Sequence, residues 1–167
     1  GSHDDYADLE RELPALVDDY RKAARNAIAA GFDGVEVHAA NTYLLEQFLR
    51  DSVNDRSGPY GGSIANRARL LFEVMQAVTE EIGAGRTGVR LSPMTTFSGG
   101  TALDSDPQAL YGHVVERLAP LGLAYLAAVL GDAGHRVSVV AVTLKKKSDV
   151  LTSNSHLWIQ HTNDLRF

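Results

Sequence analysis

The alternation of helical and strand-like segments over the first 130 residues is the strongest constraint on how this chain folds. Apolar residues recur at helical spacing in four segments, and three short β-prone runs lie between them. The helical segments are 13–30, 43–49, 63–82 and 107–118, and the β-prone runs are 32–38, 87–91 and 123–130. Strands that are connected through helices pair in parallel, so this order predicts an α/β protein built from βα units.

Capping and turn residues mark where these segments begin and end. Pro14 suits the first turn of the first helix, and Gly31 suits the position that stops it. Ser63 and Asp106 are candidate N-caps of later helices, because their side-chain oxygens can accept hydrogen bonds from free backbone N–H groups. The glycine-rich segment 58–62, just before Ser63, predicts a turn.

Residues 131–167 differ from the preceding part of the chain in charge and in pattern. They carry 5 Lys and Arg against 3 Asp and Glu, whereas residues 1–130 carry 11 against 18. This tail contains two β-prone runs, 137–144 and 156–162, with no helical pattern between them. The first run predicts either a fourth parallel strand or one arm of an antiparallel hairpin that folds back over the sheet edge.

Composition excludes several classes of protein. The 167 residues include no Cys, which excludes disulfide scaffolds and thiolate metal sites and fits a reducing, cytoplasmic location. The net charge of −5 argues against general nucleic-acid binding, which needs a basic face. No apolar run approaches the ~20 residues that span a bilayer. His156 and His161 would lie on opposite faces of a strand, so they predict no metal site. Taken together, these features lead us to expect no metal, nucleic-acid or membrane partner.

Four polar residues end or follow the predicted parallel strands, where the reactive groups of such folds gather. His38 and Asn41 come after the first strand and can both donate N–H groups to one substrate oxygen. Tyr43 adds a phenol that can act as an acid, and Arg90 adds a permanent cation near the end of the second strand. Structural alternatives remain open, since Asn41 can cap the next helix and Tyr43 can pack half-buried. His38 can be a satisfied structural residue, and Arg90 can pair with Glu36.

Longer stretches of this sequence resemble one enzyme family. The segment 23–41, which ends in GVEVHAAN, and the following YLLEQFLRD (43–51) are similar to the old yellow enzyme family of flavin oxidoreductases. Shorter matches are NDR (54–56), YGGSIANR (60–67), GVRLSP (88–93) and DSDP (104–107). The resemblance extends from Leu13 to Leu130, and the motifs form a long, ordered series.

The resemblance implies a (β/α)₈ barrel that binds FMN and reduces activated alkenes with hydride from NAD(P)H. By the same likeness, His38 and Asn41 hold the carbonyl oxygen of an α,β-unsaturated substrate, and Tyr43 protonates its α-carbon. Arg90 occupies the position of the cation beside the pyrimidine edge of the flavin. The implied substrate is a small α,β-unsaturated carbonyl compound.

The match covers only part of such a barrel, since the fold takes about 250 residues or more. We therefore expect residues 1–12 to be a tag remnant and lead-in, 13–130 to form half of a (β/α) barrel, and 131–167 to be a divergent tail. The tail has no match to the family's segments for the FMN phosphate.

The open strand edges of a half barrel favour association. We therefore expect a homodimer or a complex with a complementing half-barrel chain. The sequence predicts a truncated or rearranged ene-reductase, and the alternative is a non-catalytic half-barrel module that retains the residues but no flavin.

Overall fold

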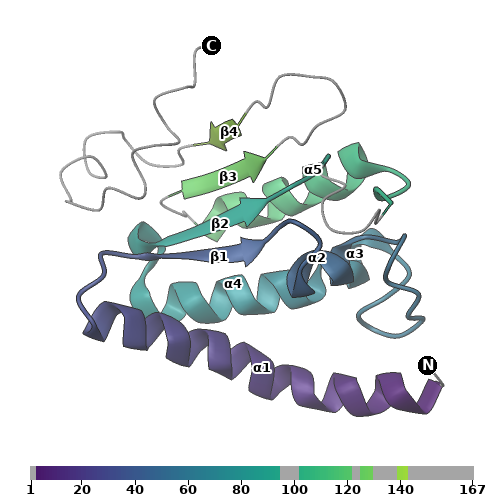
Figure 1. The fold of residues 1–167 in the computed structure, drawn as a ribbon, viewed down its shortest axis with the longest axis horizontal. Helices are drawn as coiled ribbons and strands as arrows, with labels where there is room; N and C mark the ends of the chain where they lie inside the picture. The colour runs from purple at the N-terminus through teal and green to yellow at the C-terminus, as the bar shows by residue number, and fades with distance from the viewer. Residues whose placement is uncertain (1–2, 95–101, 122–124, 130–138, 143–167) are drawn as a thin grey trace.

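The computed structural model describes residues 3–94, 102–121, 125–129 and 139–142. At its centre is a sheet, drawn in Figure 1, whose strands lie side by side in the order of the sequence. These strands are β1 (Val35–Ala39), β2 (Thr87–Leu91), β3 (Tyr125–Val129) and β4 (Val139–Val142). The strands β1, β2 and β3 run parallel, so the predicted α/β fold with parallel strands is confirmed.

The fourth strand shows that the alternative of four parallel strands is wrong. β4 pairs with β3 in the antiparallel direction, with Ala127 opposite Ala141. Only residues 130–138 separate the two strands, and a parallel crossover needs a dozen or more residues to return to the same end of the sheet. The tail strand is therefore antiparallel, and the other β-prone run, 156–162, lies outside the described residues.

The helices lie between the strands in the chain as the sequence predicts. They are α1 (His3–Ala29), α2 (Leu44–Leu49), α3 (Ile64–Arg67), α4 (Arg69–Ile82) and α5 (Pro107–Leu118), with short 3-10 turns η1 (Ala84–Arg86) and η2 (Ala119–Leu121). Both predicted N-caps are confirmed, because Ser63 accepts a hydrogen bond from the Asn66 N–H at 3.3 Å and Asp106 accepts one from the Ala109 N–H at 2.9 Å. Gly31 follows the last turn of α1 with a φ of 96°, the left-handed region that suits glycine.

The first helix begins earlier than its apolar periodicity predicts. α1 starts at His3, so Pro14 lies inside the helix and not in its first turn. Residues 7–13, just before Pro14, include two Leu, two Glu, one Ala and one Arg, which favour helix. Because of this propensity the helix continues through Pro14, although proline has no N–H and one backbone hydrogen bond of the helix is missing there.

The helix predicted over 63–82 is divided into α3 and α4. The chain reorients at Ala68, which has φ −82° and ψ −9° and is fully buried. The preceding residue, Arg67, donates hydrogen bonds to the Gly62 and Leu49 carbonyls and pairs with Asp104. These contacts hold the short α3 against neighbouring segments and account for the break.

The core lies between the helices and one face of the sheet. Val37 on β1 and Val89 on β2 are almost fully buried and belong to one apolar cluster with Leu71 and Val74 of α4 and Val114 of α5. Side chains alternate between the two faces of a strand, so α4 and α5 cover the same face. Figure 1 shows α1 running along α4 on the outer side of this helical layer. On β1 and β2, the opposite face of the sheet carries charged and polar residues.

Candidate active site at the carboxyl ends of the strands

The sheet face that turns away from the helices carries charged and polar side chains. On β1, Val37 and Ala39 are buried in the core, whereas Glu36 and His38 are half-buried. The parallel register pairs His38 with Arg90 on β2, so these two side chains leave the sheet on the same side. Two of the predicted site residues therefore lie on adjacent strands at the expected edge.

Arg90 forms an ion pair with Glu36, as its structural alternative predicts. The Arg90 Nε lies 2.6 Å from the Glu36 Oε1, and the two side chains are 37% and 20% exposed. The carboxylate fixes the direction of the guanidinium, and the exposed remainder of Arg90 keeps hydrogen-bond donors available to a ligand. Arg90 is thus both structurally engaged and accessible.

His38 and Tyr43 come together across the turn that follows β1. Their ring centroids are 5.3 Å apart and the planes are inclined at 50°. Tyr43 is 54% exposed, so it is not a half-buried packing residue. Asn41 does not cap α2, because the N-cap position is taken by Tyr43. The structure therefore brings His38 and Tyr43 together with Asn41 in the turn between them.

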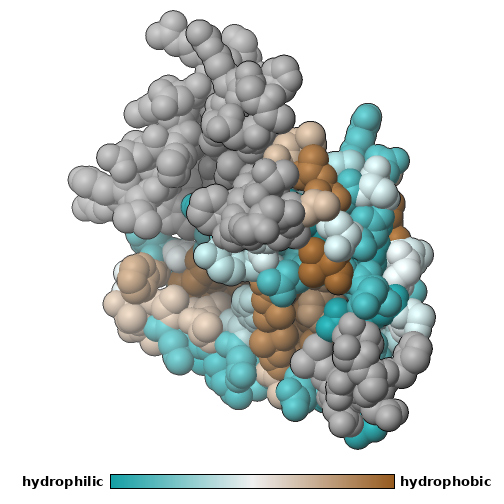
Figure 2. All heavy atoms as spheres, turned by 45° about the vertical axis from the view of Figure 1, so that its right-hand side comes forward, coloured by the Kyte–Doolittle hydropathy of each residue, from teal (hydrophilic) through white to brown (hydrophobic). Residues whose placement is uncertain are grey.

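The same end of the molecule exposes apolar surface. Large apolar side chains just after β1 and β2 are exposed, with Leu44 at 41% and Met94 at 37%. Figure 2, which turns the carboxyl ends of the strands forward, shows hydrophobic side chains gathered between hydrophilic ones. An apolar surface beside a few directed polar groups is the usual composition of a small-molecule site.

The turn between His38 and Tyr43 has an unusual backbone. Asn41 and Thr42 have φ values of 57° and 62°, both in the left-handed region. Asparagine tolerates this region, but for a β-branched threonine it is a true outlier that costs on the order of 1–3 kcal/mol. Such strain persists only where surrounding contacts hold it, and it often occurs at functional sites.

Beneath this turn lies a group of buried polar residues, which we call the buried cluster: Glu46, Arg50, Ser92 and Tyr111. Glu46 and Arg50 are 0% and 1% exposed. Glu46 Oε1 accepts hydrogen bonds from the Ser92 and Tyr111 hydroxyls, each at 2.6 Å, and lies 3.1 Å from Arg50.

The four site residues predicted from the sequence form a second set, which we call the rim: His38, Asn41, Tyr43 and Arg90. The buried cluster connects α2, the segment after β2, and α5 directly under the rim.

Sequence reasoning missed the buried cluster. The sequence predicts a short helix over 43–49 but assigns no role to the charged residues in and after it. One signal was available, because Glu46 and Arg50 stand at an i, i+4 spacing among the apolar residues Leu45, Phe48 and Leu49. Opposite charges in an otherwise apolar helix indicate a buried pair.

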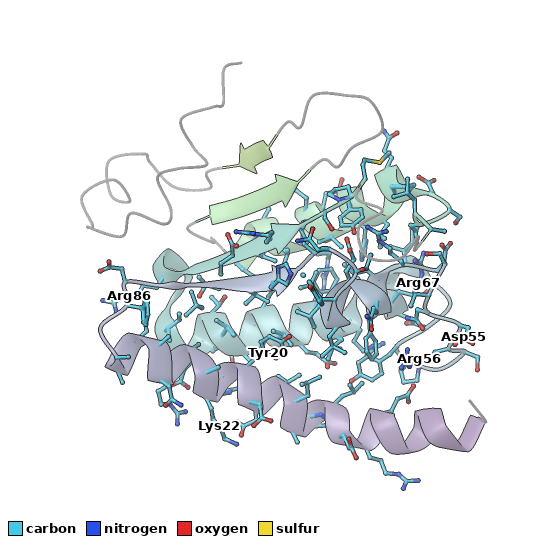
Figure 3. The ribbon with its side chains drawn as sticks, viewed as in Figure 1. Tyr20, Lys22, Asp55, Arg56, Arg67 and Arg86 are labelled. Carbon is cyan, nitrogen blue, oxygen red and sulfur yellow. The ribbon has the colours of Figure 1, made fainter. Side chains whose placement is uncertain are left out.

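A second ionic group fixes the segment before α5. Asp104 pairs with Arg67 and accepts a hydrogen bond from the Asp51 N–H at 2.9 Å, and the Ser105 N–H donates to Asp51 at 2.9 Å. Figure 3 labels Arg67 at the end of the molecule to which β1 and β2 point, whereas Arg86 lies at the opposite end. These contacts support the loops of the site from the side.

Two pKa shifts follow from these contacts. Burial, together with the neighbouring Glu46 carboxylate, raises the pKa of Tyr111 far above its ordinary range. Burial acts to raise the pKa of Asp51, but the hydrogen bonds from Ser105, together with the Arg67 charge and a hydrogen bond with Asp104, lower the pKa overall. Tyr111 is therefore a neutral hydrogen-bond donor at all ordinary pH values, and Asp51 is an acceptor.

In the part of the chain that the structure describes, no group of three or more His, Cys, Asp or Glu is arranged to hold a metal ion. Among the same residues, no helix combines the length and apolarity that a membrane crossing requires.

The sequence matches one family model over most of its length. Residues 9–151 match the model described as the NADH:flavin oxidoreductase / NADH oxidase family. The match continues beyond Leu130, the last residue of the motif series. The chain is 56% identical over 107 residues to 12-oxophytodienoate reductase 1 of Oryza sativa subsp. japonica, covering 64% of this chain and 28% of that relative.

Solved structures resemble the chain in fold as well as in sequence. An old yellow enzyme homologue from Zymomonas mobilis superposes with a TM-score of 0.68 at 48% identity, covering 71% of this chain and 33% of that one. A mutant of morphinone reductase in complex with tetrahydroNAD superposes with a TM-score of 0.70 at 44% identity, covering 75% of this chain and 34% of that one. The chain thus spans about a third of the length of the relatives it matches.

Proposed function

Because the chain belongs to the NADH:flavin oxidoreductase / NADH oxidase family, we propose that it carries the substrate-binding part of an FMN-dependent ene-reductase. Such an enzyme uses NAD(P)H to reduce the activated C=C bond of a small α,β-unsaturated carbonyl compound. The similarity to a 12-oxophytodienoate reductase and to old yellow enzyme structures supports this reaction class.

The contact of His38 with Tyr43 is the observation that carries this proposal. The rings lie 5.3 Å apart, so a single small molecule can touch both, and Asn41 lies in the turn between them. His38 and Asn41 donate hydrogen bonds to the substrate's carbonyl oxygen and stabilise the negative charge that develops there when the β-carbon accepts hydride. Tyr43 then donates its phenolic proton to the α-carbon, which completes the addition of two hydrogens.

Arg90 is the residue that would hold the flavin ring. When bound, FMN supplies the hydride that it receives from NAD(P)H. The donor set of the sheet face fits the pyrimidine edge of a flavin, because Arg90 is a permanent, partly exposed cation beside His38. Glu36 orients this guanidinium from the neighbouring strand and balances part of its charge when the flavin is absent.

The described sheet is proposed to be one part of a (β/α)₈ barrel. Residues 13–130 are its βα units, the preceding residues from His3 onward belong to the first helix, and residues 131–167 are a tail in which the family match continues as far as residue 151. β1 is an edge strand of the described sheet, and an unpaired parallel edge favours pairing with a further strand. A homodimer or a complementing half-barrel chain would supply that strand. The antiparallel β4 means that a dimer does not close the barrel with four parallel strands from each chain.

A non-catalytic half-barrel module is the second candidate function. The ion pair between Arg90 and Glu36 favours it, because the proposed flavin contact already has a partner within the chain. In that case the rim residues persist as structure, and no flavin is retained.

Incubation with FMN separates the two functions. The full chain is mixed with FMN, passed through a desalting column and examined for visible flavin absorbance. An ene-reductase retains the absorbance, which NAD(P)H then bleaches in the absence of oxygen and an enone restores. A colourless protein after FMN incubation contradicts the enzyme and supports the module.

A further inference from the structure

The Asn41–Thr42 turn requires support from outside itself. Its two residues are both left-handed, although neither is glycine. A threonine in this region is sterically disfavoured, so a free peptide of this sequence would leave the conformation. The turn nevertheless sets the separation of the His38 and Tyr43 rings, which lie on either side of it.

Both backbone amides of the turn are connected to the Glu46 carboxylate. The Thr42 N–H donates directly to the Glu46 Oε2 at 2.5 Å. The Asn41 N–H donates to the Ser92 Oγ at 2.7 Å, and the Ser92 hydroxyl donates in turn to the Glu46 Oε1 at 2.6 Å. One carboxylate therefore restrains two consecutive residues, one directly and one through a hydroxyl.

The carboxylate is itself held by other elements. The Tyr111 hydroxyl of α5 donates to Glu46 Oε1 at 2.6 Å, and the Arg50 guanidinium lies 3.1 Å from the same oxygen. Glu46 has no exposed surface, and hydrogen bonds to a charged acceptor in such a place are stronger than those between neutral groups. The position of the turn is thereby tied to β2 and α5.

We propose that Glu46 is a positioning residue of the candidate site: it holds the Asn41–Thr42 turn in its left-handed conformation and so sets the geometry of His38, Asn41 and Tyr43. Its effect on the turn is a property of this chain alone. Its effect on substrate rests on the proposed function.

Hydrogen exchange of backbone amides in the full 167-residue chain tests the effect on the turn. Glu46→Gln keeps the size of the side chain but replaces one acceptor oxygen by an NH₂ group. The amides of Asn41 and Thr42 should lose protection by about tenfold or more, whereas those of β1 and α4 keep theirs. Unchanged protection at both turn amides overturns the proposal, and so does an equal loss throughout β1 and α4, which would show a general stabilising role only.

Glu73→Gln is the matched control for this change. Glu73 also accepts a hydrogen bond from a phenol, that of the half-buried Tyr60, at 3.0 Å. Glu73 itself lies on α4, away from the turn. Its substitution should leave the Asn41 and Thr42 amides as they are. If Glu46→Gln does not fold, Ser92→Ala replaces it: the Asn41 amide should then lose protection while the Thr42 amide retains it. Full protection of Asn41 in that variant overturns the proposal.

Ligand binding tests the effect on substrate. In FMN-loaded protein, Glu46→Gln should weaken binding of 4-hydroxybenzaldehyde by about tenfold, more than any loss of FMN affinity. The loss should be smaller in a Thr42→Gly background, because glycine adopts the left-handed conformation without support. Equal losses of phenol and FMN affinity overturn the positioning role. If wild-type protein binds no FMN, the proposed function fails, but the amide measurement still decides whether Glu46 holds the turn.

Discussion

The rim and the buried cluster lie within one site but differ in how far their charged and polar groups are exposed to water. Tyr43 and Arg90 on the rim are 54% and 37% exposed, whereas Glu46 and Arg50 in the buried cluster are 0% and 1% exposed. Exposed groups can bind a ligand and be replaced without loss of the fold. Buried charges cannot be replaced singly, because each depends on a partner for its solvation. The comparison separates residues that do chemistry from residues that hold them in place.

The two ion pairs of the site illustrate the difference. Arg90 and Glu36 form a partly exposed pair between neighbouring strands, and water screens their attraction. Arg50 and Glu46 form a buried pair, which hydroxyl and backbone groups complete. Removing one partner of the ion pair should therefore lower the stability of the fold only slightly on the rim but strongly in the buried cluster.

Arg50→Met should give the largest effect on stability. The substitution leaves the Glu46 carboxylate buried without its cation, which costs about 3–5 kcal/mol. That is a large part of the 5–15 kcal/mol that stabilises a typical domain. Urea unfolding followed by circular dichroism measures the free energy of unfolding.

Lys22→Met is the control for Arg50→Met. Lys22 lies 2.9 Å from Asp18 on α1, but both side chains are more than half exposed. Its substitution should not change the urea midpoint measurably. Equal midpoints for Arg50→Met and the wild type would show that the buried cluster does not stabilise the fold.

Tyr43→Phe should leave stability unchanged and reduce the rate of alkene reduction. The exposed phenol makes little contribution to packing, but loss of a proton donor lowers a rate by about a hundred- to ten-thousandfold. Stopped-flow kinetics follow flavin reduction by NAD(P)H and flavin reoxidation by the enone as separate steps. Only the second should slow, and equal slowing of both would contradict the role of Tyr43 as proton donor.

His38→Ala and Asn41→Gly should each weaken binding of a phenolic ligand by about tenfold, since each removes one hydrogen bond to the ligand oxygen, and glycine adopts the left-handed φ of residue 41 without strain. Isothermal titration of FMN-loaded protein with 4-hydroxybenzaldehyde measures the affinity. His113→Ala is the control, because His113 lies on α5 with its ring 5.8 Å from that of Phe72, on the helical side of the sheet. Wild-type affinity in both rim variants would exclude them from the binding site.

Much of the fold was predictable because its signals are local. β2 occupies the predicted residues 87–91, and α5 begins after the predicted cap Asp106 and ends at Leu118. The start of α1 was not predictable from apolar spacing, because the helix continues through Pro14. The break at Ala68 depends on contacts of Arg67 with residues from distant parts of the chain, and no local pattern indicates it.

The candidate site was predictable only in its rim. His38 and Arg90 follow from the rule that reactive residues gather at the carboxyl ends of parallel strands, and the structure places them opposite each other. Ser92 and Tyr111 give no such signal, since a single serine after a strand and a tyrosine on a helix are common. Their convergence on Glu46 depends on how α5 packs, which is a tertiary property.

Alkaline pH gives the smallest predicted effect and tests the burial of Tyr111. Burial and the Glu46 carboxylate raise the pKa of Tyr111 above its unfolded-state value near 10. Above pH 10 the unfolded chain therefore loses a proton that the folded chain keeps. The stability due to this group is complete below that pH and declines above it, by up to about 1.4 kcal/mol per pH unit.

Tyr111→Phe should remove this slope from the pH dependence of urea unfolding, at the cost of about 1 kcal/mol near neutral pH for the lost hydrogen bond. Tyr60→Phe is the matched comparison, because burial and Glu73 also raise the pKa of Tyr60, but its phenol is less buried than that of Tyr111. Tyr60→Phe should therefore reduce the slope of the free energy of unfolding against pH less than Tyr111→Phe does. If the free energy of unfolding falls equally between pH 10 and 11 in the two variants and the wild type, the Tyr111 phenol is not held in the buried cluster. The distinction between the rim and the buried cluster then fails at this residue.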